Sequence, residues 1–247
     1  MTEQPALLNN VAPLRNVMAL SGLIDRIQTR GLGLPGMAVF YGPSGYGKTT
    51  AAVWNANKTR AYQVQVKSAW RGKKLCQSIL LDLGIPPART VADMVDQISE
   101  EIARSRRPLI IDEADHLMTN SMIELVRDIY ESSGAAIVLI GEERLPQKLQ
   151  KYERVHGRML DWVAAQPADL KEVAHLARIY CRGVELDAGM QELVLQASHA
   201  SVRRICVNLD RVREFALTTG KSVITAADWG KRDFFTGLAP AARRDLA

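Results

Sequence analysis

Apolar and polar positions along the first part of the chain alternate between helical spacing and short apolar runs. Apolar residues recur every three or four positions over residues 14–27, and glycines follow, so this stretch is predicted to be a helix. Apolar or alternating runs predict strands at 37–41, 61–66, 109–111, 136–140 and 159–164, and helical spacing predicts helices at 73–83 and 91–104. Strands that alternate with helices are typical of a parallel sheet covered on both faces.

The strand signals stop after Gln166 and Pro167, and helical spacing takes over at 169–181, 187–198, 202–218 and 226–235. Asp169, Asp187 and Thr225 stand at the start of three of these stretches and are suited to cap a helix N-terminus. We therefore expect an N-terminal helical segment (1–35), an α/β core (36–167) and a small all-helical domain with a short tail (168–247).

The composition excludes several classes of protein. Apolar residues make up 47% of the chain and charged residues 24%, which is ordinary for a globular protein and argues against disordered or fibrous structure. Three widely spaced cysteines fit neither a disulfide framework nor a metal cluster, and they favour a reducing cytoplasm. No apolar run approaches the ~18 residues of a membrane span, and the N-terminus lacks the pattern of a secretory signal.

The positive charge is concentrated in one part of the sequence. The net charge is +5, yet no Asp or Glu occurs between Arg26 and Leu81, a stretch that holds nine basic residues. Such a stretch attracts polyanions. The alternative for any one lysine is that it merely solvates a helix surface.

A phosphate-binding motif lies between the first predicted strand and the helix after it. Residues 42–49 fit the pattern G-x-x-x-x-G-K-[ST], whose backbone N–H groups and helix N-terminus surround phosphates. Its lysine bridges the β- and γ-phosphates and its hydroxyl residue coordinates Mg²⁺. The residues expected to bind ATP and Mg²⁺ here are Gly42, Pro43, Ser44, Gly45, Tyr46, Gly47, Lys48, Thr49 and Thr50.

A second motif supplies two carboxylates. An apolar strand ends in Asp112 and Glu113, 64 residues after Lys48. With the phosphate motif in place, Asp112 is expected beside the Mg²⁺, together with Thr49, and Glu113 is expected to polarise the attacking water. Glu113 indicates hydrolysis as well as binding.

With these two motifs the chain resembles the AAA+ ATPase family, which implies a five-stranded parallel P-loop core followed by a small C-terminal all-helical lid. The resemblance implies that Arg158, or else Arg154, is an arginine finger for a neighbouring subunit and that Arg203 contacts phosphate from the lid. Glu142 stands where the family carries a small polar sensor residue. One alternative is therefore a member of the family that binds ATP but hydrolyses it poorly.

Within that family, residues 112–117 and 129–141 resemble the transposition target-selection ATPases of bacteria and phages. The resemblance implies a homo-oligomer, as a helical filament or ring, that binds double-stranded DNA without sequence preference when ATP is bound. It further implies delivery of target DNA to a transposase and slow hydrolysis stimulated by DNA or transposase. Residues 67–74 match the region that such proteins turn toward DNA, and the expected contacts are Lys67, Arg71, Lys73 and Lys74.

Two other readings remain open at this point. A helicase loader of the same family would bind a helicase in place of a transposase. A secretion or assembly ATPase would act on protein partners without DNA. The acid-free basic stretch favours DNA over the second of these.

Overall fold

A computed structural model of the chain describes residues 14–238, and within them all side chains except those of residues 119–121. The expected N-terminal segment up to residue 13 and the expected tail from residue 239 lie outside the described residues. The described chain divides into two compact units, residues 14–166 and residues 167–238.

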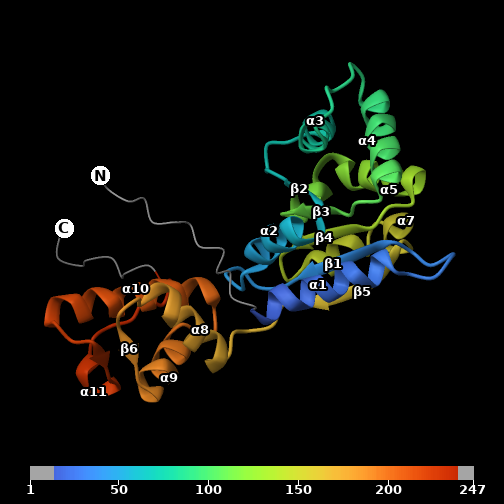
Figure 1. Cartoon of the computed structure of the whole chain (residues 1–247). Helices are drawn as coiled ribbons and strands as arrows, with labels where there is room; N and C mark the ends of the chain where they lie inside the picture. Colours follow the sequence, from blue (N-terminus) through green and yellow to red (C-terminus); the bar gives the residue numbers. More distant parts are fainter. Residues whose placement is uncertain (1–13, 239–247) are drawn as a thin grey trace, which may run out of the picture. The chain divides into compact units, whose positions relative to one another are not determined.

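The first unit contains a five-stranded parallel sheet, as the sequence predicts (Figure 1). Its strands are β1 (Met37–Tyr41), β2 (Tyr62–Gln65), β3 (Leu109–Asp112), β4 (Ile137–Gly141) and β5 (Met159–Ala164). They lie in the order β2-β3-β4-β1-β5, and each neighbouring pair is parallel. All five carboxyl ends therefore lie at one edge of the sheet.

Helices cover both faces of this sheet because successive strand residues point to opposite sides. One face packs against α3 (Gly72–Leu83), α4 (Val91–Ser105) and α5 (Met122–Ser133), in a core that includes Val39, Ile111 and Leu139. The other face is covered by α1 (Arg15–Gln28) and α2 (Lys48–Thr59). In Figure 1 α1 lies on the side of the sheet away from α3 and α4.

Between the third and fifth strands the structure contains elements that the sequence reading did not assign. The 3₁₀-helix η1 (Ala114–Ser121) leads directly into α5, and the short helices α6 (Leu145–Leu149) and α7 (Glu153–His156) join β4 to β5. None of the helices within residues 14–238 has the length and apolar character needed to cross a membrane.

The second unit consists mainly of helices, α8 (Leu170–Tyr180), α9 (Ala188–Ala197), α10 (Val202–Thr219) and α11 (Ala226–Trp229). The side chains of Asp169, Asp187 and Thr225 accept backbone N–H groups at three helix starts, so the predicted caps are confirmed. Two short strands, β6 (Glu185–Leu186) and β7 (Val223–Ile224), also pair in parallel.

The last helix is shorter than predicted. The spacing of apolar residues predicts a helix over 226–235, but α11 ends at Trp229 because Gly230 adopts φ 63° and ψ −129°, which breaks the helix. Phe234 nevertheless stacks on the buried Trp229 ring, with 4.9 Å between centroids. The aromatic contact that suggested a helix is therefore made by an irregular segment.

Candidate nucleotide site

The phosphate motif forms the turn between β1 and α2, at the carboxyl edge of the sheet. Gly45 (φ 85°) and Gly47 (φ 79°) have left-handed backbone conformations that side chains with a Cβ atom disfavour. At Gly42 an added Cβ would lie 2.9 Å from the Cβ of Ala165, so the loop starts in close contact with the end of β5. These glycines allow the turn to place the first N–H groups of α2 at its concave side.

The Lys48 side chain folds back over its own loop. Its Nζ donates to the carbonyl oxygens of Gly42 at 2.7 Å and Pro43 at 2.9 Å. Burial lowers the pKa of this ammonium group below its ordinary value, whereas the charges of nearby carboxylates, led by Asp112 and then Glu113, act in the opposite direction. The ammonium group is thus half-buried and surrounded by acids, in a position to exchange its carbonyl partners for phosphate oxygens.

Asp112 is the last residue of β3 and Glu113 follows it, and both lie close enough to Lys48 for their charges to act on it. Asp112 is 1% exposed, and its Oδ1 accepts the N–H of Glu113 at 2.9 Å. Its buried Oδ2 has no hydrogen-bond partner among the described residues. A buried carboxylate oxygen without a donor is costly unless a cation compensates it, so this carboxylate fits a Mg²⁺ ion. Thr49, the other expected ligand, is the second residue of α2.

The backbone of Glu113 is strained. It has φ 54°, a left-handed conformation that is uncommon for a residue with a Cβ atom and costs about 1 kcal/mol or more. Its carbonyl oxygen accepts the N–H of His116, which starts the turn into η1. The half-buried carboxylate therefore occupies a defined position directly after the Mg²⁺-compatible Asp112.

Asp115 is a site residue to which the sequence reading gave no role. Its Oδ2 accepts the N–H of Glu142 at 2.6 Å, and its Oδ1 accepts Lys148 Nζ at 2.6 Å. Any Cβ at Gly141 would collide with this carboxylate, which explains the glycine at the end of β4. Asp115 thereby holds the end of β4, with the exposed Glu142, next to the segment that carries Asp112.

Asn16 of α1 connects the phosphate loop to the last strand of the sheet. Its Nδ2 donates to the carbonyl oxygens of Tyr46 at 2.9 Å and Gln166 at 2.8 Å, and its Oδ1 accepts the Gln166 N–H at 2.8 Å. Asn16 is 3% exposed, so water does not replace these bonds. Nothing in the local sequence distinguishes this asparagine, because its partners lie 30 and 150 positions away.

Replacing Asn16 with alanine is expected to lower the free energy of unfolding by about 1 kcal/mol, since it removes hydrogen bonds to the part-buried backbone groups of Gln166 and Tyr46. The affinity for ATP is expected to fall as well, because the loop loses a tether. Urea unfolding and nucleotide titration measure the two effects. Asn57→Ala, at an exposed position of α2, is the control. Equal unfolding free energies for the two variants would contradict the assigned role of Asn16.

The three arginines expected to act on nucleotide lie in different places. Arg158 precedes β5, accepts the N–H of Met37 through its carbonyl oxygen and forms an ion pair with Glu131 of α5. Arg154 is exposed on α7. Arg203 is the second residue of α10 and belongs to the second unit. Within the first unit, the side chain of Arg158 thus pairs with α5 and not with the phosphate loop.

The basic segment (residues 67–74) runs from the loop after β2 into the first turn of α3, at the same edge of the sheet as the phosphate loop. The four side chains expected to contact DNA, Lys67, Arg71, Lys73 and Lys74, are all exposed. Trp70 packs against the hydrophobic core, and any Cβ at Gly72 would lie 2.6 Å from Leu125 Cδ1. The segment is therefore anchored by apolar contacts and presents its charges outward.

Comparison with protein families gives a match of residues 32–149 to a model described as an AAA domain. Comparison with curated proteins gives no match. Among solved structures, the Orc1 protein of Aeropyrum pernix in complex with DNA is 17% identical, with a TM-score of 0.57, and the match covers 86% of this chain and 62% of that one.

Two further solved structures are similar. Cdc6p of Pyrobaculum aerophilum is 16% identical with a TM-score of 0.61, and the match covers 90% of this chain and 66% of that one. RuvB of Thermotoga maritima, a Holliday junction branch migration motor, is 18% identical with a TM-score of 0.60, over 86% of this chain and 66% of that one. This chain thus spans 62–66% of the length of the three proteins. At such identities the likeness establishes the fold alone, which is the AAA+ fold.

Proposed function

We propose that this chain, which carries an AAA domain in the AAA+ fold, is an ATPase that assembles on double-stranded DNA when ATP is bound. Contact with DNA is made by the basic segment and does not read base sequence. One observation carries this proposal. The N–H of Val66, the residue before the basic segment, donates to the carbonyl oxygen of Asp112 at 2.9 Å. A single hydrogen bond therefore links the candidate DNA contact to the candidate ATP site.

The hydrolytic chemistry follows from the site residues. Lys48 exchanges its two carbonyl partners for phosphate oxygens, and the N–H groups at the start of α2 bind further phosphate oxygens. Asp112 and Thr49 would hold a Mg²⁺ ion, which when bound would supply positive charge beside the phosphates. Glu113 accepts a proton from the attacking water, because its carboxylate lies beside Asp112 and remains accessible.

The electrostatics of the basic segment favour a polyanionic partner. Helix α3 begins at Gly72 with no acidic residue in its first turn and with Lys73 and Lys74 within it. Cations at a helix N-terminus are electrostatically unfavourable, because the helix dipole already places positive potential there. The sequence therefore concentrates positive potential at an exposed site. The negative charges of DNA phosphates would neutralise this potential.

The position of Arg158 supports action between subunits. Arg158 lies at the amino edge of β1, whereas Lys48 follows the carboxyl edge. Five residues of strand separate the two edges by roughly 16 Å, so Arg158 lies far from the phosphate loop of its own chain. An arginine finger here completes the site of a neighbouring copy, and ATP then joins subunits.

Arg158→Ala is expected to abolish assembly on DNA in the presence of ATP while leaving the fold intact. Mass photometry of protein with a long duplex measures assembly, with ATP and with ADP. Wild-type protein is expected to form large complexes with ATP alone. Arg26→Ala removes an arginine that is also exposed and also ion-paired, to Asp161, and is the control.

A mixing experiment separates a role between subunits from a role within one. Lys48→Ala protein keeps an intact Arg158, and Arg158→Ala protein keeps an intact phosphate loop. ATP hydrolysis that exceeds the sum of the two separate samples would support a finger that acts on the neighbour. An Arg158→Ala variant that assembles as the wild type does would contradict the proposal for Arg158, and Arg154 would then be tested in the same way.

For the protein partner, the resemblance of residues 112–117 and 129–141 to transposition target-selection ATPases favours a transposase. Assembled on target DNA, this protein would deliver that DNA to the transposase and activate it. A strand-transfer assay tests this, since insertion into duplex coated by the ATP-bound protein should exceed insertion into naked duplex. Equal insertion into both, with a helicase stimulating ATP hydrolysis instead, would favour a helicase loader.

A further inference from the structure

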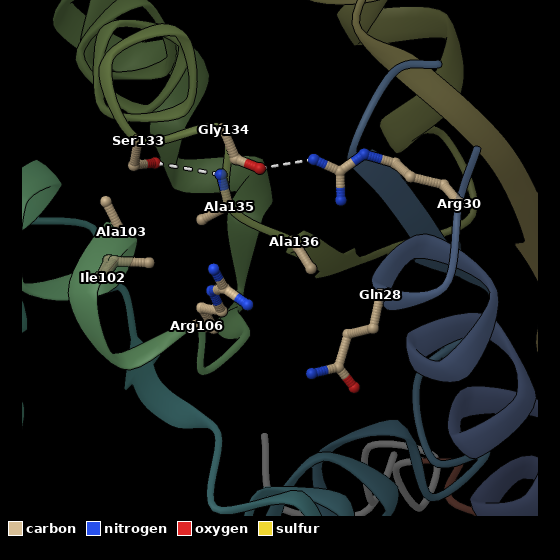
Figure 2. A pocket seen from close by; sticks show the side chains of 9 residues that line it. All are labelled: Gln28, Arg30, Ile102, Ala103, Arg106, Ser133, Gly134, Ala135 and Ala136. Atoms are coloured by element: carbon tan, nitrogen blue, oxygen red, sulfur yellow. Dashed lines mark hydrogen bonds between the residues drawn. The ribbon is translucent and has the colours of Figure 1, made fainter. Parts of the chain in front are cut away.

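A pocket of about 280 Å³ lies at the amino edge of the sheet, away from the nucleotide site. Its polar lining comes from Gln28 and Arg30 near the end of α1, from Arg106 after α4, and from Ser133 and Gly134 after α5. We call it the arginine pocket. Figure 2 shows Gln28 and Arg30, from the end of α1, and Arg106, from the end of α4, around this pocket. All of these residues precede strands β1, β3 or β4, so the pocket lies at the edge opposite to the phosphate loop.

Neutral backbone groups hold the Arg30 guanidinium in place. Its guanidinium donates to the backbone carbonyl oxygens of Ile27 at 2.7 Å, Leu34 at 3.3 Å and Gly134. These three acceptors are neutral, so they fix the guanidinium but do not compensate its positive charge. An added Cβ at Gly36 would lie 2.5 Å from Arg30 Cζ, which shows how closely the backbone surrounds this group.

Arg106 contributes a second guanidinium. Among residues 14–238, its side chain has no hydrogen-bond or ion-pair partner, whereas Arg104 is paired with Glu101 and Arg107 stacks on Tyr62 at 3.9 Å. Arg106 also has φ 54°, a left-handed conformation at the end of α4 that favours glycine. Helices α3 and α10 end in the same conformation with Gly84 and Gly220. Arg60 ends α2 in this conformation as well, so the conformation belongs to the helix end and the guanidinium is what distinguishes Arg106 within the pocket.

The lining of the arginine pocket contains no Asp or Glu, so nothing within it neutralises the two guanidinium groups. We propose that the arginine pocket binds a phosphate group. Arginine offers planar pairs of N–H donors that match two phosphate oxygens at once, and the Gln28 amide supplies further donors. Phosphate of a DNA backbone and phosphate of a small molecule share this chemistry.

This site is separate from the one that binds ATP and from the basic segment, because both of those lie at the carboxyl edge. The two edges are roughly 16 Å apart, the length of a strand of five residues. The inference does not depend on the proposed function, since an anion can bind here whether or not the basic segment contacts DNA.

The test compares two arginines with the same backbone geometry. Arg106→Gly removes the guanidinium from the pocket at a position where glycine is conformationally favoured, so the fold should persist. Arg60→Gly is the matched control, because Arg60 is exposed, ends α2 with φ 54° and lies outside the pocket lining. With Mg·ADP occupying the phosphate loop, the ³¹P line width of inorganic phosphate measures binding. We expect wild type and Arg60→Gly to broaden the line and Arg106→Gly to lose the broadening.

A second measurement identifies the source of the phosphate. If DNA supplies it, Arg106→Gly should weaken duplex binding and reduce the slope of log Kd against log salt by about 1, and Arg60→Gly should leave that slope unchanged. Lost phosphate broadening with an unchanged slope would support the site with a small phosphate compound as its ligand. Broadening that persists in Arg106→Gly, or is lost equally in Arg60→Gly, or is absent from the wild type, would overturn the proposal.

Discussion

Replacing Glu113 with glutamine is expected to lower the rate of ATP hydrolysis by about two to four orders of magnitude, because an amide does not accept the proton of the attacking water. ATP binding is expected to persist, since Lys48 and Asp112 keep their partners. Phosphate release measures hydrolysis, and titration with a fluorescent ATP analogue measures binding. Glu143→Gln, at a nearby exposed position, is the control and should hydrolyse ATP as the wild type does.

A second variant at Glu113 distinguishes loss of the carboxylate from loss of stability. Because its left-handed conformation favours glycine, Glu113→Gly should also lose hydrolysis without losing stability. Near wild-type hydrolysis in both variants would contradict the assignment of Glu113. The same assay with Glu142→Asn tests whether Glu142 acts as a sensor, and unchanged turnover would argue against that role.

Reversing the charges of the basic segment is expected to have the largest effect on DNA. The variant in which Lys67, Arg71, Lys73 and Lys74 are all replaced by Glu should bind duplex DNA about a hundredfold more weakly or worse at moderate salt, because phosphate contacts turn into repulsion. Its affinity for ATP should be retained, since all four side chains are exposed. Fluorescence anisotropy of a short labelled duplex measures the loss.

A control variant separates the effect of direct contact with DNA from the effect of the net charge of the protein. Arg89→Glu combined with Lys151→Glu reverses two exposed basic residues outside the basic segment, and Lys73→Glu combined with Lys74→Glu changes the total charge by the same amount. The pair within the basic segment should weaken duplex binding much more than the control pair. Equal losses of affinity would mean that duplex binding depends only on the overall charge of the protein. The basic segment would then be an ordinary solvated surface.

Much of the fold could be predicted from local patterns. Strands β1 and β5 begin and end at the predicted residues, because glycines bound the apolar run of β1 and because Gln166 and Pro167 follow the mainly apolar β5. Helix α5 was not assigned, although Ile123, Val126 and Ile129 have helical spacing, because the 3₁₀-helix before it interrupts that periodicity. The helical spacing over 226–235 suggested a longer last helix, since spacing alone does not reveal the break at Gly230.

The candidate sites divide in the same way. The phosphate loop and the pair Asp112–Glu113 are contiguous motifs, so their chemistry can be predicted from their residue types. Asn16 and Arg106 are not, since the partners of Asn16 lie far along the chain and the arginine pocket gathers residues that precede three strands. Such sites arise from strand order, which brings distant segments together only after the chain has folded.

The most direct test of the central claim is the affinity of the wild-type protein for a labelled duplex of mixed sequence, measured by anisotropy with ATP, with ADP and without nucleotide, across a salt series. We expect tight binding with ATP alone, equal for unrelated sequences and falling steeply as salt rises, because repeated lysine and arginine contacts release counterions. Absence of binding under every nucleotide condition, or equal binding in all three, would contradict the account of an ATP-controlled DNA-binding assembly.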